Sequence, residues 1–114
     1  VIGAVAPVAL TQQAIGRDGT PRVIQIKIEN RSVVSPKKAI RITENEIVDL
    51  RWSSDEAVEL HLHGYDKKLQ LGPGKTASMS ITGHATGRFP ITSHGWGRDG
   101  HGHHALTYLE VHPR

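Results

Sequence analysis

Short runs in which apolar and polar residues alternate constrain the fold of this chain of 114 residues more than any other feature. In residues 24–29 isoleucine alternates with Gln, Lys and Glu, and in residues 48–52 Val, Leu and Trp alternate with Asp and Arg. A period of two residues is typical of a β-strand with one buried face. Because no segment longer than a turn or two has a helical period, the sequence predicts an all-β protein.

The same pattern recurs along the chain and is interrupted by turn signals at short intervals. We expect further strands at residues 39–42, 58–63, 77–81, 87–93 and 105–111. About seven short strands with frequent turns, such as Gly72-Pro73-Gly74-Lys75, predict a β-sandwich or β-barrel. We expect residues 1–20 to form an irregular N-terminal arm and residues 21–114 to form one domain, because a chain of this length supports a single core.

Composition argues against several classes of protein. The net charge is only +3, the basic residues are scattered, and five residues are aromatic, so no nucleic-acid partner is expected. The absence of cysteine excludes disulfides, thiolate metal sites and thiol nucleophiles. No apolar run approaches the roughly 20 residues of a transmembrane helix. The apolar residues 1–10 lack a basic n-region, so we expect a processed chain rather than an intact signal peptide.

Four of the eight histidines lie between residues 93 and 104, together with four glycines. Histidine is the commonest metal-binding side chain because neutral imidazole offers a nitrogen lone pair. His94 directly follows one expected strand, and His101, His103 and His104 precede the next. Since consecutive strands usually lie side by side, His94 is expected to approach His101 or His104 and bind a metal ion. The alternative is a solvated polar loop.

A second pair, His61 and His63, lies in an expected strand, where two residues two positions apart share a face. This spacing presents two imidazoles to one ion. The alternative is a pair of surface or barrel-lining residues that continues a polar face with Glu59.

Other residues are candidates for supporting roles. Asp66 and Asp99 are candidates for ligands or for acceptors that orient an imidazole. For Asp66 the favoured alternative is that it caps a turn or pairs with a nearby lysine. Trp96 either shields the site from water or plugs the core beneath the loop. His84 and His112 are isolated in the sequence, so both are expected to be surface residues.

Three passages of the chain resemble the cupredoxins, the small Greek-key β-barrels of copper proteins. Residues 61–66, His-Leu-His-Gly-Tyr-Asp, resemble the strand segment that begins with the first copper-binding histidine of plastocyanin-like proteins. Residues 87–93, Gly-Arg-Phe-Pro-Ile-Thr-Ser, resemble the strand that runs from a glycine through an aromatic residue to the copper-binding cysteine. Residues 105–111 resemble the closing strand. The resemblance extends in order over residues 22–112 and implies a Greek-key, cupredoxin-like fold.

The resemblance places His61 at the first histidine ligand and His101 at the second. Ser93 falls at the cysteine position and Ala105 falls near the axial methionine position, so both sulfur ligands are missing. The only methionine, Met79, lies in a different expected strand. A blue-copper centre needs a thiolate, so a standard blue-copper electron carrier is not expected.

Histidines surround the positions where the sulfur ligands are missing. We therefore expect one metal ion held by imidazoles, with His63 and His103 as second-tier ligands and, as the first-tier ligands, His61, His94, His101 and His104. The order of intrinsic affinities favours Cu²⁺ at nitrogen ligands, with zinc and nickel as alternatives.

The expected function is copper binding, transfer or sequestration. The resemblance implies a periplasmic or secreted protein, and another periplasmic copper or redox protein is a candidate partner. Two alternatives stay open: a cupredoxin-like module that has no metal and serves in protein interaction, and a small redox enzyme with a type-2-like copper site. Nothing in the sequence identifies a substrate pocket, so no enzymatic activity is assigned.

Copper affinity is expected to fall as the pH drops through about 6.5, because a protonated imidazole cannot bind a metal. Calorimetric titration with Cu²⁺ on either side of that pH measures the effect. Equal affinity at both pH values would contradict histidine ligation.

Overall fold

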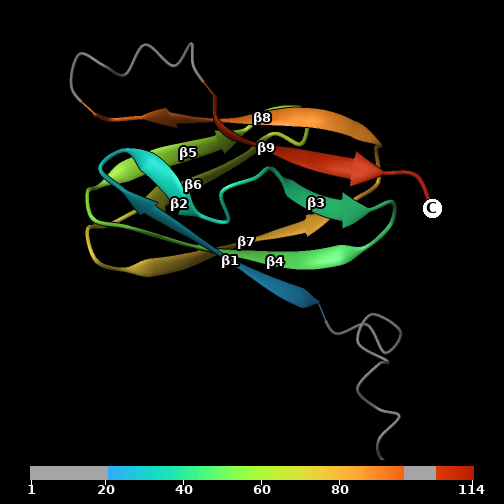
Figure 1. The fold of residues 1–114 in the computed structure, drawn as a ribbon, viewed down its shortest axis with the longest axis horizontal. Coiled ribbons are helices and arrows are strands. Elements are labelled where there is room, and N and C mark those ends of the chain that lie inside the picture. The colour runs from blue at the N-terminus through green and yellow to red at the C-terminus, as the bar shows by residue number, and fades with distance from the viewer. Residues whose placement is uncertain (1–20, 97–104) are drawn as a thin grey trace, which may run out of the picture.

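The computed structural model describes residues 21–96 and 105–114, which form nine β-strands in two sheets (Figure 1). The strands are β1 (Arg22–Glu29), β2 (Ser32–Ser35), β3 (Ile40–Thr43), β4 (Ile47–Ser54), β5 (Val58–Leu62), β6 (Lys67–Leu71), β7 (Thr76–Thr82), β8 (Gly87–His94) and β9 (Ala105–His112). These residues include no helix that could cross a membrane. The all-β class predicted from the sequence is confirmed, whereas the expected arm at residues 1–20 lies outside the described residues.

One sheet has the strand order β2-β1-β4-β7 and the other has the order β3-β9-β8-β5-β6. The β1–β4 and β3–β9 pairs are parallel, and the other pairs are antiparallel. The chain passes from one sheet to the other five times, between β2 and β3, β3 and β4, β4 and β5, β6 and β7, and β7 and β8. This arrangement is the Greek-key sandwich that the resemblance implied.

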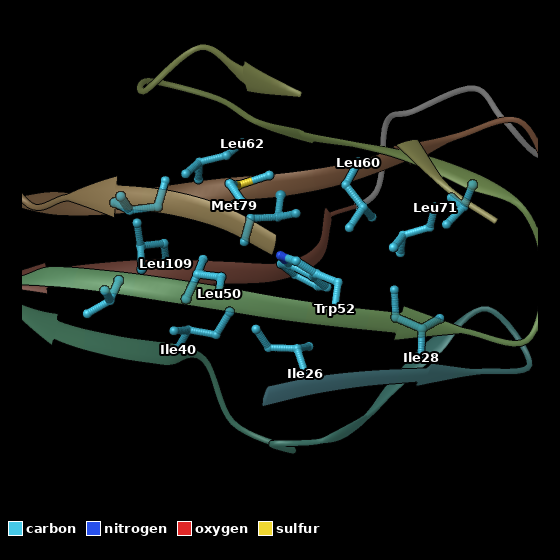
Figure 2. Packing of buried hydrophobic residues seen from close by; sticks show 14 of the residues in the cluster. Ile26, Ile28, Ile40, Leu50, Trp52, Leu60, Leu62, Leu71, Met79 and Leu109 are labelled. Carbon is cyan, nitrogen blue, oxygen red and sulfur yellow. The ribbon is translucent and has the colours of Figure 1, made fainter. Parts of the chain in front are cut away.

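The apolar residues of the alternating segments meet between the two sheets (Figure 2). Leu50 and Trp52 from β4 face Leu60 from β5 and Leu109 from β9, and all four are fully buried. Burial of one such side chain stabilises the fold by about 1.5–3 kcal/mol. The apolar residues that recur at every second position of the sequence are therefore the residues that fill the core.

Two of the nine strands, β2 and β6, were not predicted from the sequence. Each lies at the edge of its sheet and buries little apolar surface. In β2 no residue is fully buried, and in β6 only Leu71 is. A strand that buries so little apolar surface carries no clear hydrophobic alternation, whereas the edge strands β3 and β7, which alternate buried and exposed residues, were predicted.

The turn between β5 and β6 is fixed by contacts to the loop before β8. Gly64 has a φ of +87°, and a Cβ at this position would overlap the ring of Phe89. The Tyr65 hydroxyl donates a hydrogen bond to the Ala85 carbonyl (2.7 Å) and accepts one from the Ala85 N–H (3.1 Å). The Tyr65 ring also meets Phe89 edge-on, with 4.9 Å between centroids. These contacts hold the segment that directly follows His63.

A partly buried ion pair connects the start of β1 to the turn before β4. The Glu46 carboxylate accepts hydrogen bonds from Arg22 Nε (2.6 Å), Arg22 Nη2 (3.2 Å) and the Thr43 N–H (3.0 Å). Burial alone raises the pKa of Glu46, but the two donors and the positive charge of Arg22 outweigh it and hold this pKa below its ordinary value.

Replacement of this carboxylate is expected to change how stability depends on pH. Because the folded pKa of Glu46 is lowered, its contribution is present above the ordinary glutamate pKa of about 4.3 and is lost as the pH falls through the folded value. Glu46→Gln is expected to lower the free energy of unfolding by about 1 kcal/mol at neutral pH. Urea unfolding from neutral to acidic pH should show this difference shrinking. Glu29→Gln, in the exposed pair with Lys27, is the control, and a pH-independent difference for Glu46→Gln would contradict the prediction.

Candidate metal centre

The candidate site lies on the outer face of the five-stranded sheet, where β5 pairs with β8. Along β5 the buried residues Val58, Leu60 and Leu62 alternate with Glu59 and His61. The leucines and the valine therefore point into the core, and the Glu59 carboxylate and the His61 imidazole lie on the opposite face of the sheet.

The pairing of β5 with β8 decides which β8 residues share a face with His61. Thr92 lies directly opposite His61, whereas Ser93 lies opposite the buried Leu60. Directly paired residues project to the same face of a sheet, so Thr92 shares the face of His61 and Ser93 belongs to the core-facing side. The resemblance placed Ser93 at the cysteine position; by the observed register, Thr92 is the residue across from His61.

His61 and His63 lie on the same face, as their spacing predicted. Their ring centroids are 4.0 Å apart, with the planes inclined by 41°, and the His61 side chain is 21% exposed. Burial lowers the pKa of His61, the charges of His63, Lys68 and His94 lower it further, and the Asp66 carboxylate opposes them. His61 thus keeps the neutral form that a metal requires to a lower pH than an ordinary histidine does.

His63 is held by a hydrogen bond across the sheet. Its Nε2 lies 2.9 Å from Thr92 Oγ1, and Thr92 is only 6% exposed. Since His63 also packs against the ring of His61, it is placed to fix the orientation of that ring. Thr92 was missed by sequence reasoning, because only the β5–β8 register shows which β8 residue faces the histidine pair.

His94 ends β8 and lies opposite Glu59. It is therefore one diagonal step from His61 on the same face, and diagonal neighbours in a sheet are separated by roughly 7–8 Å. An open hollow of about 320 Å³ borders it and is also lined by Glu59, Gln70 and Gly95. The sequence suggested Glu59 only as part of a polar face, whereas the register makes it a carboxylate beside His94.

Asp66 lies in the turn after His63, with Oδ1 at 3.8 Å from Nε2 of His61. Its side chain is 95% exposed and its φ is +53°. At this distance and exposure Asp66 is a weak electrostatic partner that favours the charged form of His61, in line with its opposing effect on the pKa of that residue.

The predicted ligands His101, His103 and His104 lie outside the described residues, as does Asp99. Within residues 21–96 and 105–114, no group of three or more His, Asp or Glu side chains is placed to hold a metal ion. The imidazoles that the described part brings to one face are those of His61, His63 and His94. Imidazole nitrogen without sulfur suits Cu²⁺, Zn²⁺ or Ni²⁺ and does not suit a blue-copper centre.

Trp96 and the two remaining histidines are also described. Trp96 is 7% exposed and belongs to the hydrophobic cluster, which favours the second of its two alternatives, a residue that fills the core beneath the loop. His84 is exposed and packs against Tyr65, with 4.6 Å between ring centroids and the planes inclined by 45°. His112, also expected at the surface, has a side chain that is 45% exposed and lies within 3.2 Å of both Arg41 Nε and a Glu110 oxygen.

Comparison with solved structures identifies the fold. The chain is similar to a chain of a heme-copper terminal oxidase dimer, with 23% identity and a TM-score of 0.62 over 83% of this chain and 67% of the other. It is similar to a copper-binding protein solved in the apo form (11%, TM-score 0.58, 78% and 85%). A third similar structure is the periplasmic domain of subunit II of cytochrome oxidase (CoxB) of Bradyrhizobium japonicum (11%, TM-score 0.57, 82% and 83%).

Neither a protein-family model nor a curated protein sequence matches the chain. The structural neighbours show that the protein has the cupredoxin-like fold, as the three sequence passages implied.

Removal of the Thr92 hydroxyl is expected to destabilise the protein, because it leaves the His63 nitrogen on the sheet without that partner. We expect Thr92→Val to lower the free energy of unfolding by about 1 kcal/mol, measured by urea unfolding. The control is Thr76→Val, at an exposed position of β7. Equal losses in the two variants would show that the His63–Thr92 hydrogen bond does not support the site.

Proposed function

We propose that this protein binds Cu²⁺ through histidines at one end of its sandwich and serves in copper binding, transfer or sequestration. The observation that carries the proposal is the β5–β8 register, which brings His61 and His94 to one face of the sheet. This face ends where the chain leaves β8 for the histidine-rich segment. In the proposed site His61 and His94 are ligands, and His101 and His104 complete the set.

The chemistry of the donors supports copper as the metal. Imidazole is a good ligand for Cu²⁺, Zn²⁺ and Ni²⁺, and the order of intrinsic affinities places Cu²⁺ first. The chain has no cysteine, so no thiolate is available to build a centre for rapid electron transfer. The proposed site is therefore a nitrogen-rich centre that holds Cu²⁺.

We assign His63 a supporting role in this site rather than that of a ligand. Its Nε2 is engaged by Thr92 and its ring packs on His61. A hydrogen-bonded neighbour that fixes a ligand ring typically changes metal affinity 10–100-fold when it is removed. His103 remains the other second-tier candidate.

The structural neighbours support a setting outside the cytoplasm. One of them is described as a copper-binding protein and another as a periplasmic domain. We extend these properties to this chain as part of the proposal: a periplasmic or secreted protein whose candidate protein partner is another copper or redox protein of that compartment.

Replacement of a proposed ligand should weaken copper binding far more than replacement of a distant histidine. We expect wild-type protein without a tag to bind one Cu²⁺ in calorimetric titration. His61→Ala and His94→Ala should each lose at least about tenfold in affinity, because a lost ligand weakens a site at least as much as a lost supporting residue. His84→Ala is the matched control, because it removes an exposed imidazole near the opposite end of β8.

Unchanged binding in His61→Ala would contradict the assigned site. Failure of the wild-type protein to bind Cu²⁺, Zn²⁺ or Ni²⁺ at micromolar levels would overturn the proposed function. That result would favour a cupredoxin-like module that acts through protein contacts alone.

A further inference from the structure

The turn between β1 and β2 places an arginine where the backbone favours glycine. The strands pair up to Glu29 and Ser32, so only Asn30 and Arg31 form the turn. Both have left-handed backbones, with φ values of 52° and 64°. This is the pattern of a type I′ hairpin turn, in which Asn-Gly is the preferred pair. A residue with a side chain strains the backbone at the second position of this turn. We therefore attribute the arginine at this position to the contacts that its guanidinium makes.

The Arg31 side chain joins two segments that are distant in the sequence. Its Nη2 lies 3.1 Å from Glu56 Oε1, and its Nε lies 3.3 Å from Glu56 Oε2. Its guanidinium carbon also lies 5.6 Å from the centroid of the Trp96 ring, within cation–π distance. The Asn30 N–H also donates a hydrogen bond to Asp55 Oδ2 (3.1 Å), so the hairpin turn is attached to the turn before β5.

The two partners of Arg31 adjoin the strands that carry the proposed ligands. Glu56 lies in the turn that leads into β5 and precedes His61 by five residues. Trp96 follows His94 by two residues and is anchored in the core. Arg31 thus connects the start of β5 to the end of β8 at the end of the sandwich where His94 lies.

We propose that Arg31 is a positioning residue for the metal site and holds the end of β8, where His94 lies, against the turn that leads into β5. The inference rests on the proposed function. A guanidinium does not bind a metal cation, and its positive charge opposes one by simple Coulomb repulsion. Removal of Arg31 would therefore strengthen Cu²⁺ binding if charge alone mattered, and would weaken it if geometry matters. The sign of the change separates the two explanations.

Arg31→Gly tests this in full-length protein, because glycine suits the backbone of the turn. We expect a thermal midpoint within about 5 °C of wild type. We expect Cu²⁺ affinity in calorimetric titration to fall about tenfold. The electron paramagnetic resonance spectrum of the bound Cu²⁺ should also change, because the ligand geometry is altered.

Arg88→Ala is the matched control. It removes a positive charge and another arginine–aromatic contact, 3.9 Å from the centroid of Tyr108, near the opposite end of β8. We expect wild-type Cu²⁺ affinity and an unchanged spectrum in this variant.

Arg31→Lys keeps the charge but lacks the planar fork that contacts Glu56 and lies over the Trp96 ring. We expect weakened Cu²⁺ binding in this variant as well. If Arg31→Gly proves less stable than expected, the affinity of Arg31→Lys decides whether Arg31 positions the metal site. Wild-type affinity and spectrum in both Arg31 variants would overturn the positioning role and leave the proposed function intact. Failure of the wild-type protein to bind Cu²⁺ would overturn the proposed function, and this inference with it.

Discussion

The pairing of β5 with β8 is the constraint on which both the core and the candidate site depend. Leu60 is opposite Ser93, and His61 is opposite Thr92. Because side chains alternate between faces, a slip of one residue would move histidine into the core and leucine into water. Full burial of Leu60 and Leu62 contributes about 1.5–3 kcal/mol each, which is enough to hold the register. The hydrophobic core thereby fixes where the imidazoles lie.

The same reasoning explains how much could be predicted from the sequence. Strands with one buried face, such as β4 and β5, carry a clear two-residue period and were predicted, whereas the edge strands β2 and β6 were not. The shared face of His61 and His63 followed from spacing within one strand. The residue across from His61, Thr92, could not be predicted, because cross-strand register depends on pairing between distant segments.

The surroundings of His61 favour a metal ion that bonds to several imidazoles over a proton that binds to one. Burial and the charges of His63, Lys68 and His94 lower the pKa of His61, so a proton is bound less tightly there. Burial and the positive charge of Lys68 also oppose a metal cation at this position. A metal ion overcomes this only by bonding to several imidazoles at once, which explains why the proposed site needs His94 and the histidines that follow it as well as His61.

Contacts from other segments restrain the histidine-bearing region at both ends. Beyond His63, the Tyr65 hydroxyl is bonded to Ala85 in the loop before β8. At the opposite end, Arg31 reaches from the β1–β2 turn to Glu56 and Trp96. A site built on strands that are restrained at both ends is more precise than one built on a loop alone. The two proposed ligands in the described residues, His61 and His94, therefore take their rigidity from the sandwich.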